Sequence, residues 1–392
     1  MVFPGLDEVW AAIPEARIAG GAVRDALSGR VIADIDMASP LAPEMVMARA
    51  RKAGLKAVPT GLAHGTVTIM AKGRGFEVTS LRRDVETDGR HAVVEFTDDW
   101  REDAARRDFT MNAMFMDRAG QIYDYFGGRE DLAAGRVRFV GVAGERIRED
   151  YLRALRYFRF LARYGLGEPD PVALAAIAAN VEGVLGLSAE RVWHELKLIL
   201  RAPLPCQVVA LMAASGVLGL VWPEAEPARL EALVGAGAPM EPLLRVAALG
   251  VGDLAVFAAR LRLSGAEGET LAAYVRPNAL APGDDDAALR RALCDDGAEV
   301  LAARSWLAGG YGAEWAALRA RLAALPRPVF PLQGRDLLTI GAVPGPELGA
   351  ALRATEVWWR EGGCVAGREE CLVRVQEPGE AGAAGAGLGS ST

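Results

Sequence analysis

Two carboxylates stand one residue apart near the start of the chain, at Asp34 and Asp36. They lie in an apolar run that we expect to form a strand over Val31 to Ala38. Side chains two residues apart project from the same face of a strand, so the two charges would lie close together and repel each other. A cation between them would relieve that repulsion. Oxygen ligands favour Mg²⁺, which also binds phosphates, whereas most isolated pairs of this kind are solvated loop residues.

A pair of glycines precedes these carboxylates. Gly20 and Gly21 follow an expected strand and are followed by Arg24, at the start of an expected helix over Ala22 to Leu27. Glycine lets backbone N–H groups approach a phosphate closely. Two glycines alone usually mark a turn, but GGAVRD followed by DID within one strand–turn–strand unit is more specific. The combination predicts a metal-dependent phosphoryl-transfer site.

A long polar segment and an arginine pair follow. Leu81 to Arg101 has a charged sequence with Asp-Gly in its middle, and we expect a mobile loop beside the site. Glu102 to Met116 is expected to form a helix that carries Arg106, Arg107 and Asp108 near its centre. Adjacent arginines are normally solvated, but next to a triphosphate site an arginine can fork onto phosphate.

The elements that should position these residues alternate between strands and helices up to about residue 140, and helices follow almost without interruption. Glu77 lies in one of the strands and is either a third carboxylate of the site or an exposed edge residue. The other expected elements of the first part are helices over Leu6 to Ala12 and Pro43 to Gly54, and strands over Ala16 to Ala19, Leu55 to Pro59, Thr66 to Ala71, Gly75 to Ser80, Ile122 to Asp124 and Val137 to Val140.

The second informative stretch is an expected helix over Glu149 to Tyr164. Arginines recur every three residues along it, and Asp150 shares a face with the first of them. The rest of the helix is apolar, so it should be largely buried, and buried arginines need partners. The stripe is either an internal salt-bridge surface or a set of hydrogen-bonding groups for a nucleobase. A carboxylate accepts from the exocyclic amine of C or A, and arginine donates to ring acceptors. The arginines are Arg153, Arg156 and Arg159.

Composition limits the other possibilities. The net charge is −7, so a polyanion would have to meet a local basic surface. The three histidines are scattered, which argues against a histidine-based metallohydrolase. The four cysteines match no zinc pattern or disulfide framework, and the N-terminus lacks the features of a signal peptide. We therefore expect a reduced cytoplasmic protein with no membrane and no obligate protein partner.

As a set, these motifs resemble the class II tRNA nucleotidyltransferases, or CCA-adding enzymes, and their relatives the bacterial poly(A) polymerases. The resemblance covers roughly residues 15 to 375. The motifs that carry it are GGAVRD with DID, RRDVETDGRHAVVEF, RRDFTMNAM, YDYFGGREDL, EDYLRALRYFRF, LSAERVWHEL, LRLSGAEGETL and GRDLLTIGAVPGPELG.

The resemblance implies an α+β protein with a polymerase-β-like nucleotidyltransferase palm followed by helical domains. The expected boundaries are a head over residues 1–140, a neck that recognises the nucleobase over 141–200, and an RNA-binding body and tail over 201–375. Residues 376–392 are rich in Gly, Ala and Ser and are expected to be disordered.

The resemblance also implies roles for the site residues. Asp34 and Asp36 would hold Mg²⁺ and catalyse transfer of CMP and AMP from CTP and ATP to the 3′ end of tRNA, by two-metal in-line displacement. Gly20, Gly21, Arg24 and Arg107 would contact the nucleotide phosphates. Asp150 and Arg153 would pair with the incoming base, and Arg156 and Arg159 would align these groups or reach the triphosphate.

Several alternatives remain at this stage. The nearest are a poly(A) polymerase and an enzyme that adds only CC or only A; the full-length segment over Arg82 to Arg101 favours an enzyme that proceeds to A. A catalytically inert RNA-binding module is opposed by the intact Asp34 and Asp36. An antibiotic nucleotidyltransferase is opposed by the long helical half and the arginine stripe.

Overall fold

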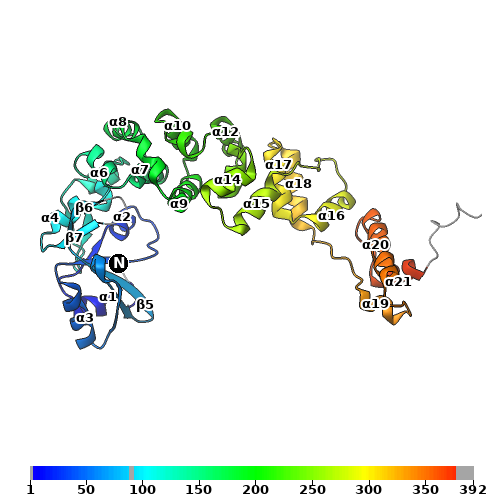
Figure 1. Ribbon diagram of the computed structural model, residues 1–392, viewed down its shortest axis with the longest axis horizontal. Helices are drawn as coiled ribbons and strands as arrows, with labels where there is room; N and C mark the ends of the chain where they lie inside the picture. The colour runs from blue at the N-terminus through cyan, green and yellow to red at the C-terminus, as the bar shows by residue number, and fades with distance from the viewer. Residues whose placement is uncertain (1–2, 88–91, 377–392) are drawn as a thin grey trace, which may run out of the picture. The chain divides into compact units, whose positions relative to one another are not determined.

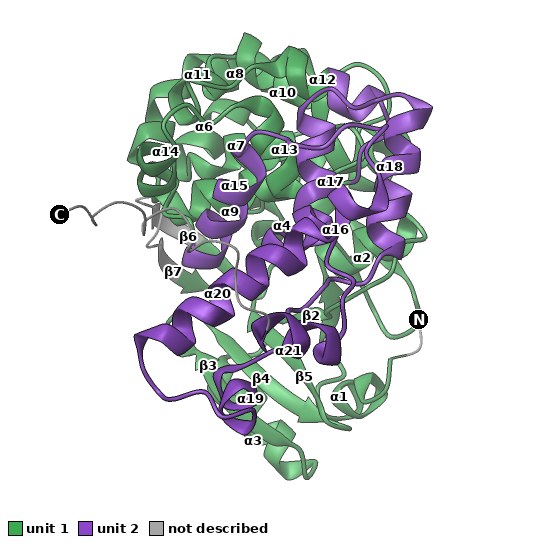
Figure 2. Cartoon of the chain, turned by 90° about the vertical axis from the view of Figure 1, so that its right-hand side faces the viewer, with its two compact units in different colours: residues 1–231, 240–263 green, residues 232–239, 264–392 purple. Residues whose placement is uncertain are grey.

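The computed structural model describes residues 3–87 and 92–376. The chain divides into two compact units (Figure 2). The first comprises residues 1–231 and 240–263, and the second comprises residues 232–239 and 264–392. In the described part of the chain, no helix is both long and apolar enough to span a membrane.

In the described residues of the first unit, seven strands form one mixed sheet (Figure 1). Their order is β3-β4-β5-β2-β1-β8-β9. β2 and β5 run parallel, and the other neighbouring pairs are antiparallel. The parallel register places Asp36 directly beside Glu77. The strands are β1 Arg17–Ala19, β2 Asp36–Ser39, β3 Lys56–Gly61, β4 Thr66–Ala71, β5 Arg74–Ser80, β8 Met114–Met116 and β9 Ile122–Asp124.

Alternate residues of the central strands pack into opposite cores, as the period of two requires. One core lies between the sheet and the helices α1 (Leu6–Ala12) and α3 (Pro43–Lys52), whose Val9 and Val46 are fully buried. Ile18, Met37 and Met114 of the strands belong to this core. The other takes the next residue of each strand, Ala19, Ala38 and Phe115. Both faces of the sheet are therefore covered, and Asp36 lies at the start of the central strand β2.

The remaining elements of the first unit are mainly helices. α7 packs against α9, α10 and α6. Asp170 caps α8 by accepting from the backbone N–H of Val172, with Pro171 in the first turn. The elements are α1 Leu6–Ala12, α2 Gly21–Leu27, α3 Pro43–Lys52, η1 Leu62–His64, β6 Arg82–Thr87, β7 Ala92–Phe96, α4 Trp100–Ala105, η2 Thr110–Asn112, α5 Gly128–Ala133, α6 Ala143–Glu149, α7 Leu152–Tyr164, α8 Pro171–Ala179, η3 Val181–Gly186, α9 Ala189–Leu200, α10 Pro205–Ala214, α11 Val217–Val221, α13 Pro242–Leu249 and α14 Leu254–Leu261, with α12 Pro227–Gly235 shared with the second unit.

In the described residues of the second unit, the regular secondary structure consists of helices. Leu289, Leu293 and Leu301 belong to one of its cores, and Trp359 and Cys371 belong to another. A capping box between Ser264 and Glu267 begins its first long helix. Its helices are α15 Gly265–Val275, α16 Asp286–Asp295, α17 Ala298–Leu307, α18 Ala313–Ala324, α19 Gly334–Thr339, α20 Pro346–Glu361 and α21 Arg368–Gln376.

The α+β class, with an N-terminal sheet domain before a mostly helical remainder, is confirmed. Some local predictions are wrong, two of them in the segments that follow. The segment Leu81 to Arg101 is not a loop, because β6 and β7 pair as an antiparallel hairpin within it. The strand predicted over Val137 to Val140 does not form: Phe139 makes one isolated bridge to Phe109. Apart from Gln376, which ends α21, the C-terminal segment predicted to be disordered lies outside the described residues.

Candidate active site

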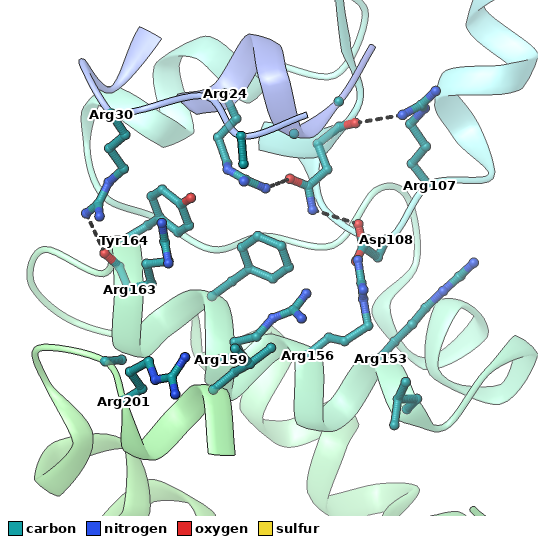
Figure 3. A pocket seen from close by; sticks show the side chains of 18 of the residues that line it. Arg24, Arg30, Arg107, Asp108, Arg153, Arg156, Arg159, Arg163, Tyr164 and Arg201 are labelled. Atoms are coloured by element: carbon teal, nitrogen blue, oxygen red, sulfur yellow. Dashed lines mark hydrogen bonds and ion pairs between the residues drawn. The ribbon is translucent and has the colours of Figure 1, made fainter. Parts of the chain in front are cut away.

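A cavity of about 1040 Å³ lies in the first unit, between the glycine turn of the sheet domain and helices α7 and α9 (Figure 3). Ten arginines and three aspartates line it. A protein with a net charge of −7 therefore holds a strongly cationic hollow, which suits a polyanionic ligand. The cavity brings together nine of the ten residues predicted from the sequence: Gly20, Gly21, Arg24, Asp34, Arg107, Asp150, Arg153, Arg156 and Arg159. The tenth, Asp36, does not line it.

The glycine turn is shaped around an arginine. Gly20 has φ 59 and precedes α2, and its N–H donates to the carbonyl of Met114 at 2.9 Å. A Cβ at this position would lie 2.7 Å from Nη1 of Arg107 and 3.1 Å from the carbonyl of Asn112. A larger residue would therefore strain the backbone and displace the Arg107 guanidinium.

Arg24 is buried and fixed from several sides. Its Nη1 donates to Oδ1 of Asn112 at 2.6 Å, and its Nη2 donates to Oδ1 of Asp25 at 3.0 Å. The guanidinium carbon lies 5.0 Å from the ring centre of Phe160 and 4.7 Å from that of Tyr164. The Tyr164 hydroxyl donates to the same Asp25 oxygen at 2.6 Å. One carboxylate and two rings thus orient this cation at the cavity wall.

The carboxylate strand is shorter than predicted. β2 begins at Asp36, so Asp34 precedes the strand instead of lying within it. The alternation still holds, because Ile35 and Met37 are buried while Asp34 and Asp36 are solvent-accessible. Reduced solvation and the negative charge of Glu77 raise the pKa of Asp36. The ionised form of Asp36 is therefore less favourable than that of a free aspartate.

These residues fit a divalent cation. Carboxylate oxygens are hard donors, and a cation would offset the lost solvation and the repulsion from Glu77 that raise the pKa of Asp36. Within residues 3–87 and 92–376, no three His, Cys, Asp or Glu residues are placed to hold one metal ion together. The fit therefore depends on Asp34 and Asp36, with Glu77 beside Asp36 in the sheet.

The helix predicted over Glu102 to Met116 is wrong. α4 ends at Ala105, η2 follows, and Met114–Met116 forms β8. The residues after α4 are instead held by distant segments, because Phe109 bridges to Phe139 and β8 pairs with β1. Within α4, the buried Asp103 accepts from Nε of Arg106 at 2.9 Å and from Nη2 of Arg107 at 3.0 Å. Burial alone would raise the pKa of Asp103, but the two guanidinium groups outweigh it and lower that pKa.

Asp108, next to the arginine pair, connects the sheet domain to α7. Its Oδ2 accepts from Nε of Arg156 at 2.7 Å, and its Oδ1 accepts from Nδ2 of Asn112 at 2.9 Å. Although burial opposes ionisation, Arg156 and Asn112 lower the pKa of Asp108. Asn112 therefore bridges Arg24 and Asp108, two residues that are labelled in Figure 3.

The helix predicted over Glu149 to Tyr164 is interrupted at its start. α6 ends at Glu149, Asp150 is extended with φ −154, and α7 begins at Leu152. Asp150 accepts from the backbone N–H of Leu152 at 3.1 Å and from Nη2 of Arg191 at 2.7 Å. The predicted shared helix face of Asp150 and Arg153 does not exist, although both residues line the cavity.

Arg153 is held at the junction of α6 and the arginine pair. Its Nη1 donates to Oε2 of Glu149 at 2.6 Å, and its Nη2 donates to the carbonyl of Arg106 at 3.0 Å. Two turns further along α7, Nη1 of Arg159 donates to Oε1 of the buried Glu195 at 3.2 Å. Burial raises the pKa of Glu195 and lowers that of Arg159, against the attraction between their charges.

Sequence reasoning missed the residues that hold the predicted ones in place, and the outermost arginines of the cavity. The supporting set is Asp103, Asn112, Arg191 and Glu195. The outer arginines are Arg30, Arg163 and Arg201. Asn112 and Glu195 lie within the motifs RRDFTMNAM and LSAERVWHEL, which offered a signal. Isolated surface arginines offer none.

The comparisons with known proteins agree over most of the chain. Residues 16–138 match the family described as the poly A polymerase head domain, and residues 168–229 match a probable RNA- and SrmB-binding site of polymerase A. The mitochondrial CCA tRNA nucleotidyltransferase 1 of Mus musculus is 36% identical over 379 residues, which cover 93% of this chain and 87% of the relative.

A second relative and a solved structure extend the comparison. The Danio rerio protein of the same name is 52% identical over 189 residues, and this match spans less than half of either protein, 47% of this chain and 44% of the relative. The crystal structure of a Bacillus stearothermophilus CCA-adding enzyme in complex with CTP has a TM-score of 0.73 and 29% identity, covering 96% of this chain and 98% of that one. The chain belongs to the CCA tRNA nucleotidyltransferase family, and it shares its head domain with the poly(A) polymerases.

Proposed function

We propose that this protein transfers CMP and AMP from CTP and ATP to the 3′ end of tRNA and so builds or repairs the CCA terminus. The observation that carries the proposal is the cationic cavity. It joins Asp34 and the glycine turn on one wall to Asp150 and Arg153 on another. A phosphate-binding surface and a base-recognising pair therefore lie within one enclosure.

Asp34 and Asp36 are the proposed ligands for Mg²⁺, the ion that oxygen donors and phosphates favour. When bound, the cation supplies positive charge that lowers the pKa of the RNA 3′-hydroxyl and neutralises the departing pyrophosphate. The remaining chemistry is positioning. Gly20 and Gly21 leave room for the nucleotide phosphates, and Arg24 and Arg107 donate to them.

Base selection is assigned to Asp150 and Arg153. Each oxygen of Asp150 already accepts one hydrogen bond, and a carboxylate has room for about four, so it can still accept from an exocyclic amine. C and A carry that amine, whereas U and G present a carbonyl oxygen that would face the carboxylate. Arg156 and Arg159 align this pair or reach the triphosphate, and their ion pairs with Asp108 and Glu195 support either role.

We also propose the division into a head over residues 1–140, a neck over 141–200 and an RNA-binding body and tail over 201–375. The match of residues 168–229 to an RNA-binding family supports an RNA substrate for the helical part. A cytoplasmic location stays a prediction from the sequence, and the relatives from Mus musculus and Danio rerio are named as mitochondrial proteins.

The test is direct. The purified protein is incubated with tRNA ending in the discriminator base, in CC or in CCA, with CTP and ATP separately and together, and the products are sized on a gel. We expect growth to CCA and no further. Long A tails would instead identify a poly(A) polymerase, and arrest after CC would identify a CC-adding enzyme.

A further inference from the structure

Three arginines at the outside of the cavity differ from the others. Arg30, Arg163 and Arg201 are exposed, and none of them pairs with a carboxylate in the part of the chain that the structure describes. The other seven lining arginines each pair with an aspartate or glutamate: Arg24, Arg106, Arg107, Arg153, Arg156, Arg159 and Arg191. The three exposed arginines, called the rim arginines below, therefore carry positive charge that the fold does not neutralise.

The rim arginines come from three separate segments. Arg30 follows α2, Arg163 lies in the last turn of α7, and Arg201 follows α9. Nη2 of Arg30 donates to the carbonyl of Arg163 at 2.8 Å, and both guanidinium groups face the ring of Tyr164, at 4.8 and 5.7 Å from its centre. In Figure 3 the three are drawn on the side of the cavity away from Arg153. Like charges gathered in this way favour an anion beside them.

Apolar side chains accompany Arg201. Pro203 and Met240 line the same cavity and are exposed, Met240 to 60%. Arg245, near the start of α13, donates to the carbonyls of Leu200 and Ala202, which ties the Met240 segment to the end of α9. Cations beside apolar side chains suit a single strand of nucleic acid, whose phosphates need charge and whose bases pack on apolar groups.

During transfer the nucleoside triphosphate and the 3′ end of the RNA must occupy the cavity together. The two substrates differ in how far they extend beyond it. A nucleoside triphosphate ends inside the enclosure, whereas an RNA strand must continue across the rim into solvent. We propose that Arg30, Arg163 and Arg201 bind the backbone phosphates of the RNA strand whose 3′ end enters the cavity. This inference rests on the proposed function and adds a subsite for the second substrate.

A purely structural role offers a competing explanation. Arg30 accompanies the C-terminal carbonyls of α7, and Arg201 lies at the C-terminus of α9, where the helix dipole favours a cation. Such a role would change stability but not the salt dependence of RNA binding. Arg163 and Arg201 are the sharper test positions, because Arg30 also anchors the segment that leads to Asp34.

The experiment measures the binding of an RNA hairpin that carries a 5′-fluorescein and a single-stranded 3′ end terminating in CC. Binding is followed by fluorescence anisotropy at several KCl concentrations. The variants are Arg163→Gln, Arg201→Gln and the double variant. The control is Arg51→Gln, an exposed arginine on α3 outside the cavity lining. We expect Kd for RNA to rise roughly threefold or more per variant. The slope of log K against log salt should shrink by about 0.7 for each RNA phosphate that a variant no longer neutralises.

Two outcomes would overturn the inference. One is an RNA affinity and salt slope equal to those of the wild type and the control. The other is a loss of CTP affinity, measured without RNA, with RNA affinity unchanged, which would assign the rim to the triphosphate. A third outcome separates the two proposals. If the wild type adds no nucleotide to any tRNA while the rim variants still lose RNA affinity, the proposed transfer reaction is refuted and the RNA-binding role of the rim arginines is supported.

Discussion

At the scale of single residues, the site is built on charges that the fold either pairs or leaves crowded. Asp36 lies beside Glu77 in a parallel register, and its pKa is raised by reduced solvation and by that neighbour. Asp103 and Asp108 face guanidinium groups, and their pKa values are lowered. The difference separates the carboxylate that we propose as a cation ligand from those that hold arginines in place.

We predict that Asp36→Asn raises the Tm of the protein in the absence of divalent cations, because it removes one of two crowded negative charges. The same substitution should abolish the rise in Tm that MgCl₂ produces in the wild type at constant ionic strength. Scanning fluorimetry measures both effects. Glu44→Gln, which changes an exposed carboxylate on α3, serves as the control and should keep the full magnesium response. An unchanged response in Asp36→Asn would contradict the assigned cation ligand.

Asp150 allows a prediction about selectivity. Asp150→Ala removes the acceptor for the exocyclic amine, so the preference for CTP over UTP, taken as the ratio of kcat/KM, should fall roughly tenfold or more. The loss should exceed any change in triphosphate affinity. Glu182→Ala, an exposed carboxylate in η3, provides the matched control. Equal selectivity in Asp150→Ala and the wild type would remove Asp150 from base recognition.

At the scale of elements, Asp103 shows how one buried side chain connects several elements beside the site. It accepts from the backbone N–H of Arg82, at the start of β6, and from both Arg106 and Arg107. The chain then turns at Asp108, and Phe109 bridges to Phe139. One carboxylate therefore joins the β6–β7 hairpin, α4 and the arginine pair.

Asp103→Asn should lower the free energy of unfolding by about 3 kcal/mol at neutral pH, because two guanidinium groups lose their buried partner. The pKa of Asp103 is lowered in the folded state, so its stabilising effect exists above the unfolded pKa near about 4 and disappears as pH falls through the folded value. Urea titrations at pH 7 and at successively lower pH should show the difference between variant and wild type shrinking. A difference that stayed constant with pH would contradict this assignment.

The local sequence pattern correctly predicted those elements whose ends are determined by residues close by in the chain. α1, β4 and β9 form over the residues expected, since apolar periodicity, Pro14 and Gly65 define them locally. The end of α4 at Ala105 and the break at Asp150 were not predictable in that way. Asp150 depends on Arg191, 41 residues later in the chain, and the sequence around it continues a helical pattern. Prediction of the site residues was limited in the same way, because local sequence does not show which distant segments will meet.

Residues whose own sequence pattern suggests chemistry were identified. Asn112 and Glu195 were missed although they lie within motifs, and the arginines recruited from separate segments were missed as well. Arg24, Arg107 and Arg153 lie in short motifs whose residue types and spacing already suggest a chemical role. Arg30 and Arg201 become neighbours of a cavity only after α2, α7 and α9 have packed. Long-range packing therefore determined both the missed helix breaks and the missed site residues.

At the scale of the molecule, charge is distributed unevenly. The chain carries a net charge of −7, yet ten arginines and three aspartates line one cavity of the first unit. Attraction of RNA must therefore come from local surfaces and not from the net charge, and it should weaken steeply with salt. The described residues of the nucleotide site all belong to the first unit, although the second has cores of its own.

This distribution predicts where a nucleotide stabilises the protein. CTP with Mg²⁺ at about 100 times its Kd should contribute roughly 2.7 kcal/mol to the unit that binds it. Hydrogen exchange measured by mass spectrometry without RNA should therefore show slower exchange in peptides from α2 and α7. Peptides from α17 and α20, which lie in the second unit, should keep their rates. CMP, which lacks the β- and γ-phosphates, is the matched control and should protect less because Arg24 and Arg107 lose partners. Equal protection in both units would show that the nucleotide site is not confined to the first.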